Sequence, residues 1–215
     1  GASVGHIPVR MKVMNDPGVM APVADAAYKE ASELQIEEMK NLIHDGLRSG
    51  ALAVGFVLAG SPMASRWEAL EMFRVAAQYE ASCHVHMRGV GDRELLNSID
   101  GLSEIVAAAV TSGAPLHVDH INSSGQHAVA SLIRMVEEAQ SKGLDITAEC
   151  YPYTAGMTGI ESAMLAEGWR ERLRVDYADL EWPETGERLT ARTFAEYREI
   201  GGMVIMHSMR QDLVD

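Results

Sequence analysis

Short apolar runs alternate with amphipathic segments along most of the 215-residue chain. A helix is predicted where Ser32 and Gln35 form a capping box and apolar residues then recur with helical spacing. The run at residues 51–58 follows directly and is apolar without interruption, which indicates a strand buried on both faces. Three further runs of this kind begin near residues 81, 115 and 144.

The four predicted strands, which start near residues 51, 81, 115 and 144, are separated by 30, 34 and 29 residues. That interval is the length of a strand followed by a crossover helix, so parallel strands are expected. Helices are predicted between them after a second capping box at Ser65 and Glu68, within residues 93–112, and over about 126–142. The pattern therefore predicts an α/β fold.

Two folds have this spacing, the doubly wound sheet and the (β/α)₈ barrel. No Gly-x-Gly-x-x-Gly or Gly-Lys-Ser/Thr loop follows a predicted strand, which weakens the case for a nucleotide-binding sheet. A closed barrel needs about 250 residues. With residues 203–206 as a candidate further strand, the sequence predicts a partial (β/α)₈ TIM-type barrel with four to five barrel strands.

Two segments interrupt the alternation. Residues 1–31 contain several glycines and prolines and predict an irregular lead-in. Residues 154–200 predict a loop and short-helix insertion, with weak helices over 161–173 and 190–199. We interpret residues 1–215 as a single domain that forms the central to C-terminal part of a barrel.

Composition narrows the class of protein. Lys and Arg number 18 against 31 Asp and Glu, and the net charge of −13 argues against nucleic acid or an anionic membrane as a partner. No apolar run reaches the roughly 18 residues of a spanning helix. Cys83 and Cys150 lie within apolar runs and predict buried, inert thiols of a cytoplasmic protein.

Histidines mark the ends of two successive predicted strands. His86 and His120 each precede a loop, and they are separated by 34 residues, one strand-helix unit. Sites in parallel α/β folds form at the C-terminal ends of strands, so these two side chains can meet at one metal ion, typically Zn²⁺. The competing interpretation is a pair of hydrogen-bonded core histidines, and spacing alone leaves both open.

The neighbours of this pair are interpreted from strand alternation. His84 shares a face with His86 and is either a third ligand or a core residue, of which we favour the core residue. Alternation places His117 and Asp119 opposite His120, with His117 packing toward a helix and Asp119 in an ion pair or cap outside the barrel. The remaining histidines, which have no partner pattern and predict structural or exposed roles, are His6, His44, His127 and His207.

The end of the fourth predicted strand carries two tyrosines. Tyr151 and Tyr153 share one face with Glu149. Tyr153 either hydrogen-bonds a substrate or is a buried tyrosine with a satisfied hydroxyl, and spacing does not decide between these roles.

Five short strings extend over nearly the whole chain, and the most specific is the Tyr-Pro-Tyr-Thr-Ala-Gly string at residues 151–156. In this order they resemble motifs of the N-acyl-D-amino-acid deacylases, the D-aminoacylase family of the amidohydrolase superfamily. The strings are Val-Gly-His-Ile-Pro-Val-Arg at 4–10, Gly-Ala-Leu-Ala-Val-Gly-Phe at 50–56, His-Met-Arg at 86–88, Asp-His-Ile at 119–121, and the string at 151–156.

The resemblance implies a zinc-dependent barrel hydrolase that cleaves the amide bond of N-acyl-D-amino acids. It identifies His86 and His120 as metal ligands on the fifth and sixth barrel strands, and Tyr153 as a substrate contact. Asn122 stands where family members have a lysine near the substrate carboxylate, so it is a candidate substrate-binding residue that puts carboxylate recognition in doubt. In such enzymes zinc activates a water, and a carboxylate transfers its proton.

Three family features have no counterpart in these residues: the His-x-His of the first strand, a further metal ligand and the catalytic aspartate. We therefore assign no catalytic residue to the chain, expect the general-base aspartate beyond Asp215, and expect residues 1–215 to be inactive alone. The expected partners are a small-molecule N-acyl amino acid and, through exposed barrel edges, further copies of the chain. Two alternatives stay open, a non-catalytic barrel-derived binding or interaction module and a metal-independent barrel isomerase or lyase.

Overall fold

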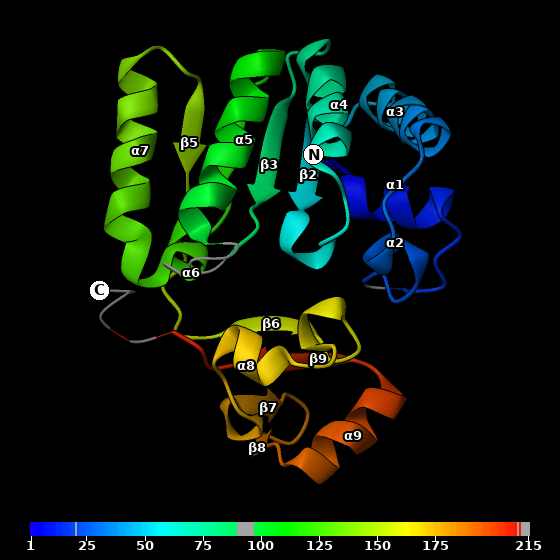
Figure 1. Ribbon diagram of the computed structural model, residues 1–215, viewed down its shortest axis with the longest axis vertical. Helices are drawn as coiled ribbons and strands as arrows, with labels where there is room; N and C mark the ends of the chain where they lie inside the picture. The colour runs from blue at the N-terminus through cyan, green and yellow to red at the C-terminus, as the bar shows by residue number, and fades with distance from the viewer. Residues whose placement is uncertain (20, 90–96, 210, 212–215) are drawn as a thin grey trace.

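The computed structural model describes residues 1–19, 21–89, 97–209 and 211, and these residues contain two sheets, one parallel and one antiparallel. The parallel sheet is five-stranded, with its strands side by side in sequence order (Figure 1). Its strands are β1 (Val4–Gly5), β2 (Ala53–Val57), β3 (Ser82–His86), β4 (Leu116–Val118) and β5 (Ile146–Ala148).

The antiparallel sheet is built from short strands, β6 (Gly156–Gly159), β7 (Leu180–Trp182), β8 (Glu187–Arg188) and β9 (Met203–Met206). They lie side by side in the order β6-β9-β7-β8. The α-helices are α1 (His6–Val13), α2 (Asp25–Tyr28), α3 (Glu33–Arg48), α4 (Arg66–Ala77), α5 (Ser98–Ser112), α6 (Ile121–Gly125), α7 (Val129–Ser141), α8 (Trp169–Leu173) and α9 (Ala191–Ile200).

The strand order confirms the prediction of a partial barrel. A doubly wound sheet reverses its strand order at a switch point, whereas β1 to β5 follow one another without reversal. The long helices α3, α4, α5 and α7 connect successive strands, as the spacing predicted, and α4, α5 and α7 lie side by side along the sheet (Figure 1). The predicted start of α5, at residues 93–96, lies outside the described residues.

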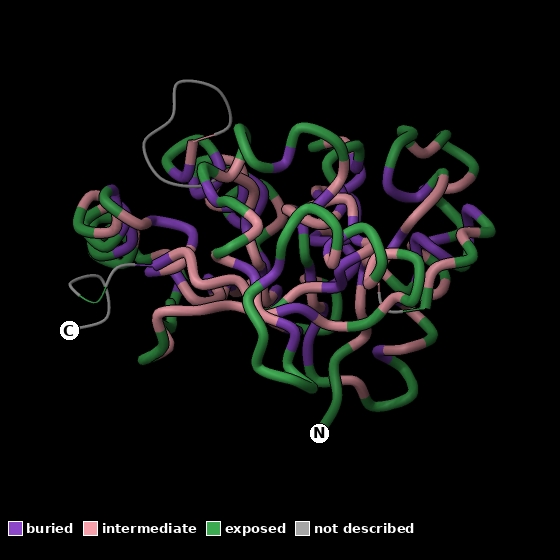
Figure 2. Tube along the Cα trace, turned by 90° about the horizontal axis from the view of Figure 1, so that it is seen from below, coloured by how far each residue is buried: buried purple, intermediate pink, exposed green. Residues whose placement is uncertain are grey.

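The two faces of the parallel sheet differ in chemistry. Alternate side chains of the central strands, such as Phe56, Val85 and Val118, are buried against the helices. The other face carries Ser82, His84 and His86 on β3 and His117 on β4, which are half-buried, and we call it the open face. Figure 2 shows this mixture of buried and half-buried residues along the chain. In a closed barrel the open face would be the interior.

Local signals explain the helix ends. Ser32 accepts a hydrogen bond from the Gln35 N–H, and its own N–H donates to the Gln35 side chain, which confirms the first capping box. Ser65 caps α4 by accepting a hydrogen bond from the Glu68 N–H, but the second predicted capping box is only half formed, because the Glu68 carboxylate is bonded to His6 and Arg10 instead. Gly113 ends α5 in the left-handed region, at φ 78°, where a residue without Cβ is favoured.

The lead-in is more ordered than predicted, because residues 1–31 contain β1, α1 and α2. The sequence did not predict α1 because a proline usually interrupts a helix. Pro8, however, lies in the first turn of α1, where the missing N–H costs no hydrogen bond. The helix is held by Arg10, which is fully buried and donates to Glu68 and to the carbonyls of Ala26 and Lys29. The fifth barrel strand is therefore β1, not residues 203–206.

The insertion is also more ordered than predicted. Residues 154–200 supply three strands of the antiparallel sheet, and 203–206 form β9, which lies between β6 and β7. The helices expected over 161–173 and 190–199 correspond to short α8 and to α9. A separate apolar cluster, centred on Trp169, Trp182 and Phe194, supports this sheet. That residues 1–215 form a single domain remains a prediction.

The antiparallel sheet lies beyond the C-terminal ends of the parallel strands (Figure 1). Two clefts confirm this arrangement, since each is lined both by a parallel-strand end or its loop and by β6 and β9. Among the described residues, none of the helices has the length and apolar character needed to cross a membrane.

Candidate functional site

The predicted histidine pair comes together at the ends of β3 and β4. Nε2 of His120 lies 2.6 Å from Nδ1 of His86, and the ring centroids are 4.5 Å apart. β4 ends at Val118, and His120 adopts a left-handed conformation, φ 35° and ψ 59°. This backbone conformation is uncommon for a residue with a side chain, and it occurs at sites where surrounding structure holds it.

His86 is in the protonation state that a metal requires. Burial and the adjacent His120 lower the pKa of His86 to about 4, because both disfavour a second positive charge. Its imidazole is therefore neutral near pH 7 and has one nitrogen lone pair available for a ligand.

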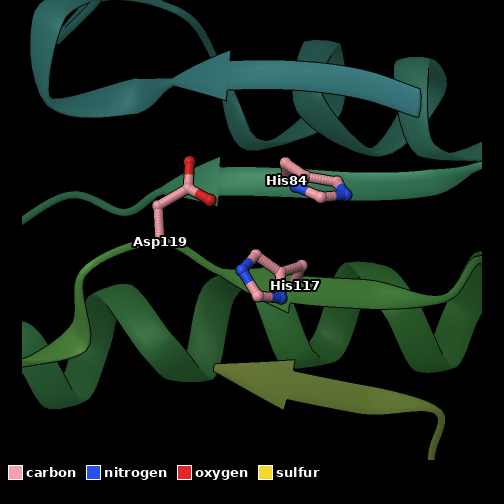
Figure 3. Close-up of side chains that lie close together, drawn as sticks. All are labelled: His84, His117 and Asp119. Carbon is pink, nitrogen blue, oxygen red and sulfur yellow. The ribbon is translucent and has the colours of Figure 1, made fainter. Parts of the chain in front are cut away.

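A second cluster lies on the open face, and its residue on β3, His84, precedes His86 by two residues. His84 and His117 are partners in the register of β3 and β4, with ring centroids 4.7 Å apart. Ligand atoms of His84, His117 and Asp119 all lie within 4.8 Å of one another (Figure 3). Burial raises the pKa of the Asp119 carboxyl, although the nearby histidines oppose this shift.

This cluster corrects three expectations. His84 is a half-buried residue of the open face and not a core residue. His117 lies on the open face and does not pack toward a helix, and Asp119 lies beside it and not outside the barrel. Strand alternation failed because β4 stops at Val118, so the positions of Asp119 and His120 follow a turn and not a pleat.

Glu149 links the two histidine groups. Its carboxylate lies 3.8 Å from Nδ1 of His120 and 3.7 Å from Nε2 of His117, and the side chain is half-exposed. Strand alternation had placed Glu149 at the end of the fourth predicted strand with Tyr151 and Tyr153, but no specific role followed from that placement.

The two candidate substrate-binding residues, Asn122 and Tyr153, differ in their burial and in their contacts. Asn122 is buried, its Nδ2 donates to the carbonyl of Tyr151 at 2.9 Å, and its Oδ1 accepts from the Tyr151 N–H at 3.4 Å. The Asn122 amide thus ties the loop after β4 to the segment after β5. Tyr153 is 66% exposed, and its ring centroid lies 6.2 Å from that of Tyr151. Substrate contacts of both residues remain predictions.

A cavity of about 220 Å³ joins the histidine pair to the antiparallel sheet. His86, His120, Tyr151 and two serines of α6 line it on the barrel side, and methionines and a serine after β9 line it on the side of the antiparallel sheet. Within the described residues, no Lys or Arg lines this cavity. The serines and two of the methionines are Ser123, Ser124, Ser208, Met157 and Met206.

Arg88, directly after the β3 end, is a clamp that sequence reasoning did not assign. Its Nε donates to both carboxylate oxygens of Glu104 at 3.1 Å, and its Nη1 donates to the carbonyls of Ser61 and Pro62. Arg88 therefore fixes the loop after β2 and the helix α5 near His86. The available sequence signal was an arginine two residues after a strand-end histidine.

The two cysteines and the four remaining histidines lie outside the two histidine groups. Burial raises the pKa of the Cys83 thiol, which fits the predicted inert cysteine, whereas Cys150 is exposed and not buried. His6 is buried and hydrogen-bonded to Glu68 at 2.6 Å. His44 contacts Tyr79, His207 contacts Glu181, and His127 is exposed.

The parallel sheet in sequence order, with helices between its strands, is the architecture of part of a (β/α)₈ barrel, and solved enzyme structures share this fold. The chain matches the N-acyl-D-glutamate deacylase of Bordetella bronchiseptica, solved with zinc and a phosphonate inhibitor, at a TM-score of 0.73 and 20% identity. The match covers 100% of this chain and 44% of that one.

Two D-aminoacylase structures match equally well. One is a mutant in complex with copper chloride, and the other concerns the role of a binuclear metal centre. Each has a TM-score of 0.73 and 21% identity, and the match covers 99% of this chain and 44% of the other. No protein-family model and no curated protein sequence gives a significant match. The likeness establishes a shared fold over about 44% of the length of these enzymes.

The histidine pair fits part of a zinc site. Two imidazole nitrogens on one tetrahedral Zn²⁺, each at about 2.0–2.1 Å, would lie about 3.3 Å apart. The present separation of 2.6 Å is a direct hydrogen bond, so the two nitrogens would have to move apart by about 0.7 Å to share a zinc ion. Among the described residues, no third ligating side chain is grouped with this pair, so the pair accounts for two ligands.

Proposed function

We propose that these residues belong to a metal-dependent hydrolase that cleaves the amide bond of N-acyl-D-amino acids. The observation that carries the proposal is the meeting of His86 and His120 at adjacent strand ends. The shared fold with an N-acyl-D-glutamate deacylase and with D-aminoacylase supports the reaction class. Zinc is the proposed metal, and the activity belongs to the whole protein that contains the chain.

The pair would hold the metal through Nδ1 of His86 and Nε2 of His120. A zinc ion there would polarise a substrate carbonyl and lower the pKa of a bound water. Glu149 faces the other ring nitrogen of His120, so it would orient that imidazole and make it a stronger ligand. Asn122 would act as a positioning residue, because its two hydrogen bonds hold Tyr151 at the cavity wall.

The cavity suggests how a substrate would lie. Its methionine wall, including Met157 and Met206, would contact an alkyl part of the substrate. Ser123 and Ser124 of α6 and Ser208 after β9 also line the cavity, and we propose that their hydroxyls hydrogen-bond the substrate amide or carboxylate. Since no cation lines the described cavity, we propose that hydroxyls, or residues beyond the described ones, bind the carboxylate.

The test is hydrolysis by the protein that carries these residues, loaded with zinc and supplied with N-acetyl-D-glutamate, other N-acetyl-D-amino acids and their L-enantiomers. We expect zinc-dependent release of acetate from D-substrates. His86→Ala and His120→Ala should each reduce turnover to background. His127→Ala removes an exposed histidine outside the site and serves as the matched control, with unchanged turnover expected.

Two results would contradict the proposal. One is turnover that survives both His86→Ala and His120→Ala. The other is a folded, zinc-loaded protein that hydrolyses none of the D-substrates, which would favour the non-catalytic binding module. Circular dichroism of each variant separates loss of the site from loss of the fold.

A further inference from the structure

We propose that His84, His117 and Asp119 form a second divalent-metal site, distinct from the His86–His120 pair. This group of three, which we call the open-face triad, lies on the open face of the parallel sheet (Figure 3). It requires no residue of the proposed hydrolytic pair, and it does not depend on the proposed activity.

The ligand types are those of a transition-metal site. Two imidazoles and one carboxylate are a common three-ligand set for Zn²⁺ and its first-row neighbours, and they leave one position open for water. The three ligand atoms lie within 4.8 Å of one another, and a tetrahedral ion needs them about 3.3 Å apart. All three side chains are half-buried, so they retain the freedom to close on an ion while part of their hydration is already lost.

Each histidine of the triad is held by a hydroxyl through one ring nitrogen. Ser82 Oγ lies 3.0 Å from Nε2 of His84, and Thr147 Oγ1 lies 2.7 Å from Nδ1 of His117. When those nitrogens donate to the hydroxyls, Nδ1 of His84 and Nε2 of His117 carry the free lone pairs. Figure 3 shows these rings on neighbouring strands, with the Asp119 carboxylate close to both.

This arrangement is the usual support of a metal-bound histidine. A ligating imidazole commonly donates its second N–H to an oxygen acceptor, which fixes both tautomer and ring orientation. Here two different strands supply such acceptors, since Ser82 is on β3 and Thr147 is on β5. The carboxylate of Glu149, 3.7 Å from Nε2 of His117, offers a further oxygen at the same point.

Two members of the triad, His84 and Asp119, also line an open hollow. This hollow of about 410 Å³ is lined by His84, Asp119, His120 and Glu149 together with the ends of β1 and β2. Among the described residues, His86 and His120 are not grouped with the triad within 4.8 Å, so the two clusters would hold separate ions. A metal in the triad would join β3 to β4 and stiffen the open face.

The experiment measures zinc stoichiometry and affinity in the full 215-residue chain by competition with a chromophoric chelator. The key background is the double variant His86→Ala/His120→Ala, which removes the hydrolytic pair and keeps the triad. We expect this background to retain one equivalent of zinc, and His84→Ala, His117→Ala or Asp119→Asn added to it to abolish that equivalent. His127→Ala in the same background is the matched control and should change nothing.

The hydroxyl partners give a finer test. Ser82→Ala and Thr147→Val keep every ligand and should weaken zinc binding by about tenfold each, the usual effect of losing an outer partner of a metal ligand. X-ray absorption spectroscopy at the zinc edge, on the same background, should find two imidazole nitrogens at about 2.0–2.1 Å.

The possible outcomes separate the two proposals. A double variant that stays folded by circular dichroism and binds no zinc overturns the triad and leaves the hydrolytic pair unaffected. Zinc that persists after Asp119→Asn and His84→Ala also overturns it, because the ion must then lie elsewhere. If the double variant binds as much zinc as the parent chain, the His86–His120 pair fails as a metal site and the triad stands.

Discussion

The two sheets of this chain differ in what holds them together. The parallel sheet packs its aliphatic side chains, such as Val85 and Val118, against four long helices, and buried polar groups such as Arg10 and Glu68 are paired inside that core. The antiparallel sheet depends on a smaller apolar cluster that combines aliphatic and aromatic side chains, and the ion pairs around it are exposed or half-buried. We therefore expect the parallel sheet to set global stability and the antiparallel sheet to open locally.

The largest effect is expected at the buried ion pair of the parallel sheet. Glu68 and Arg10 side chains are fully buried, and Glu68 also accepts from His6 at 2.6 Å. Glu68→Gln removes the charge that Arg10 needs, so the free energy of unfolding should fall by about 3–5 kcal/mol. Urea denaturation measures it, with Glu38→Gln on the exposed side of α3 as control. A change below about 1 kcal/mol would show that water reaches Arg10.

In the antiparallel sheet the matching test is Phe194→Ala. The Phe194 ring stacks on Trp169 at 5.4 Å and tilts against Tyr177 at 5.4 Å, and it is 8% exposed. A loss of about 3 kcal/mol is expected, at the lower end for a Phe→Ala change because the site is near the surface. Hydrogen exchange should show that the Val204 amide on β9 loses protection, whereas the Val85 amide on β3 keeps its protection. Equal loss at both would break the comparison, since the sheets would then unfold together.

The same contrast shows why the sequence predicted one sheet and not the other. Uninterrupted runs such as residues 51–58 give a strand signal that survives without tertiary information. β6 has four residues and β7 has three, and neither is an uninterrupted apolar run. The apolar cluster that supports them is completed by side chains from other elements, such as Trp169 and Phe194. Their pairing with β9 joins residues far apart in sequence, which periodicity cannot detect.

The candidate site divides in a similar way. His86 and His120 were predictable because each lies at or shortly after the C-terminal end of a strand, and neighbouring ends meet in any parallel sheet. The open-face triad was missed because alternation was extended past Val118, where β4 ends. The hydrogen bonds between Asn122 and Tyr151 were equally hidden, since they join the short helix α6 to the segment after β5, which is distant in sequence.

Low pH should reduce the stability that ionised Glu68 contributes to the parallel sheet and its helices. Burial alone raises the pKa of Glu68, but its hydrogen bond from His6 and the charges of His6 and Arg10 outweigh burial and lower it. A carboxyl with a lowered pKa in the folded state contributes stability above its unfolded value of 4.5, and loses it as pH falls through the folded value. The difference in unfolding free energy between the parent and Glu68→Gln should therefore shrink below about pH 4.5. A difference that stays constant from about pH 7 to about pH 3 would rule out ionised Glu68 as its source.

The smallest effect is expected at an exposed ion pair, where the same Glu→Gln change is made at a pair that water reaches. Arg192 Nη1 lies 2.8 Å from Glu196 Oε1 on α9, one helical turn apart, and both side chains are more than half exposed. Glu196→Gln should cost about 0.3–0.5 kcal/mol, and salt should reduce even that. The shorter distance of an ion pair does not decide its contribution; the cost of leaving a buried partner uncompensated does. Were Glu196→Gln as damaging as Glu68→Gln in the same urea titration, burial could not be the reason that the two sheets differ.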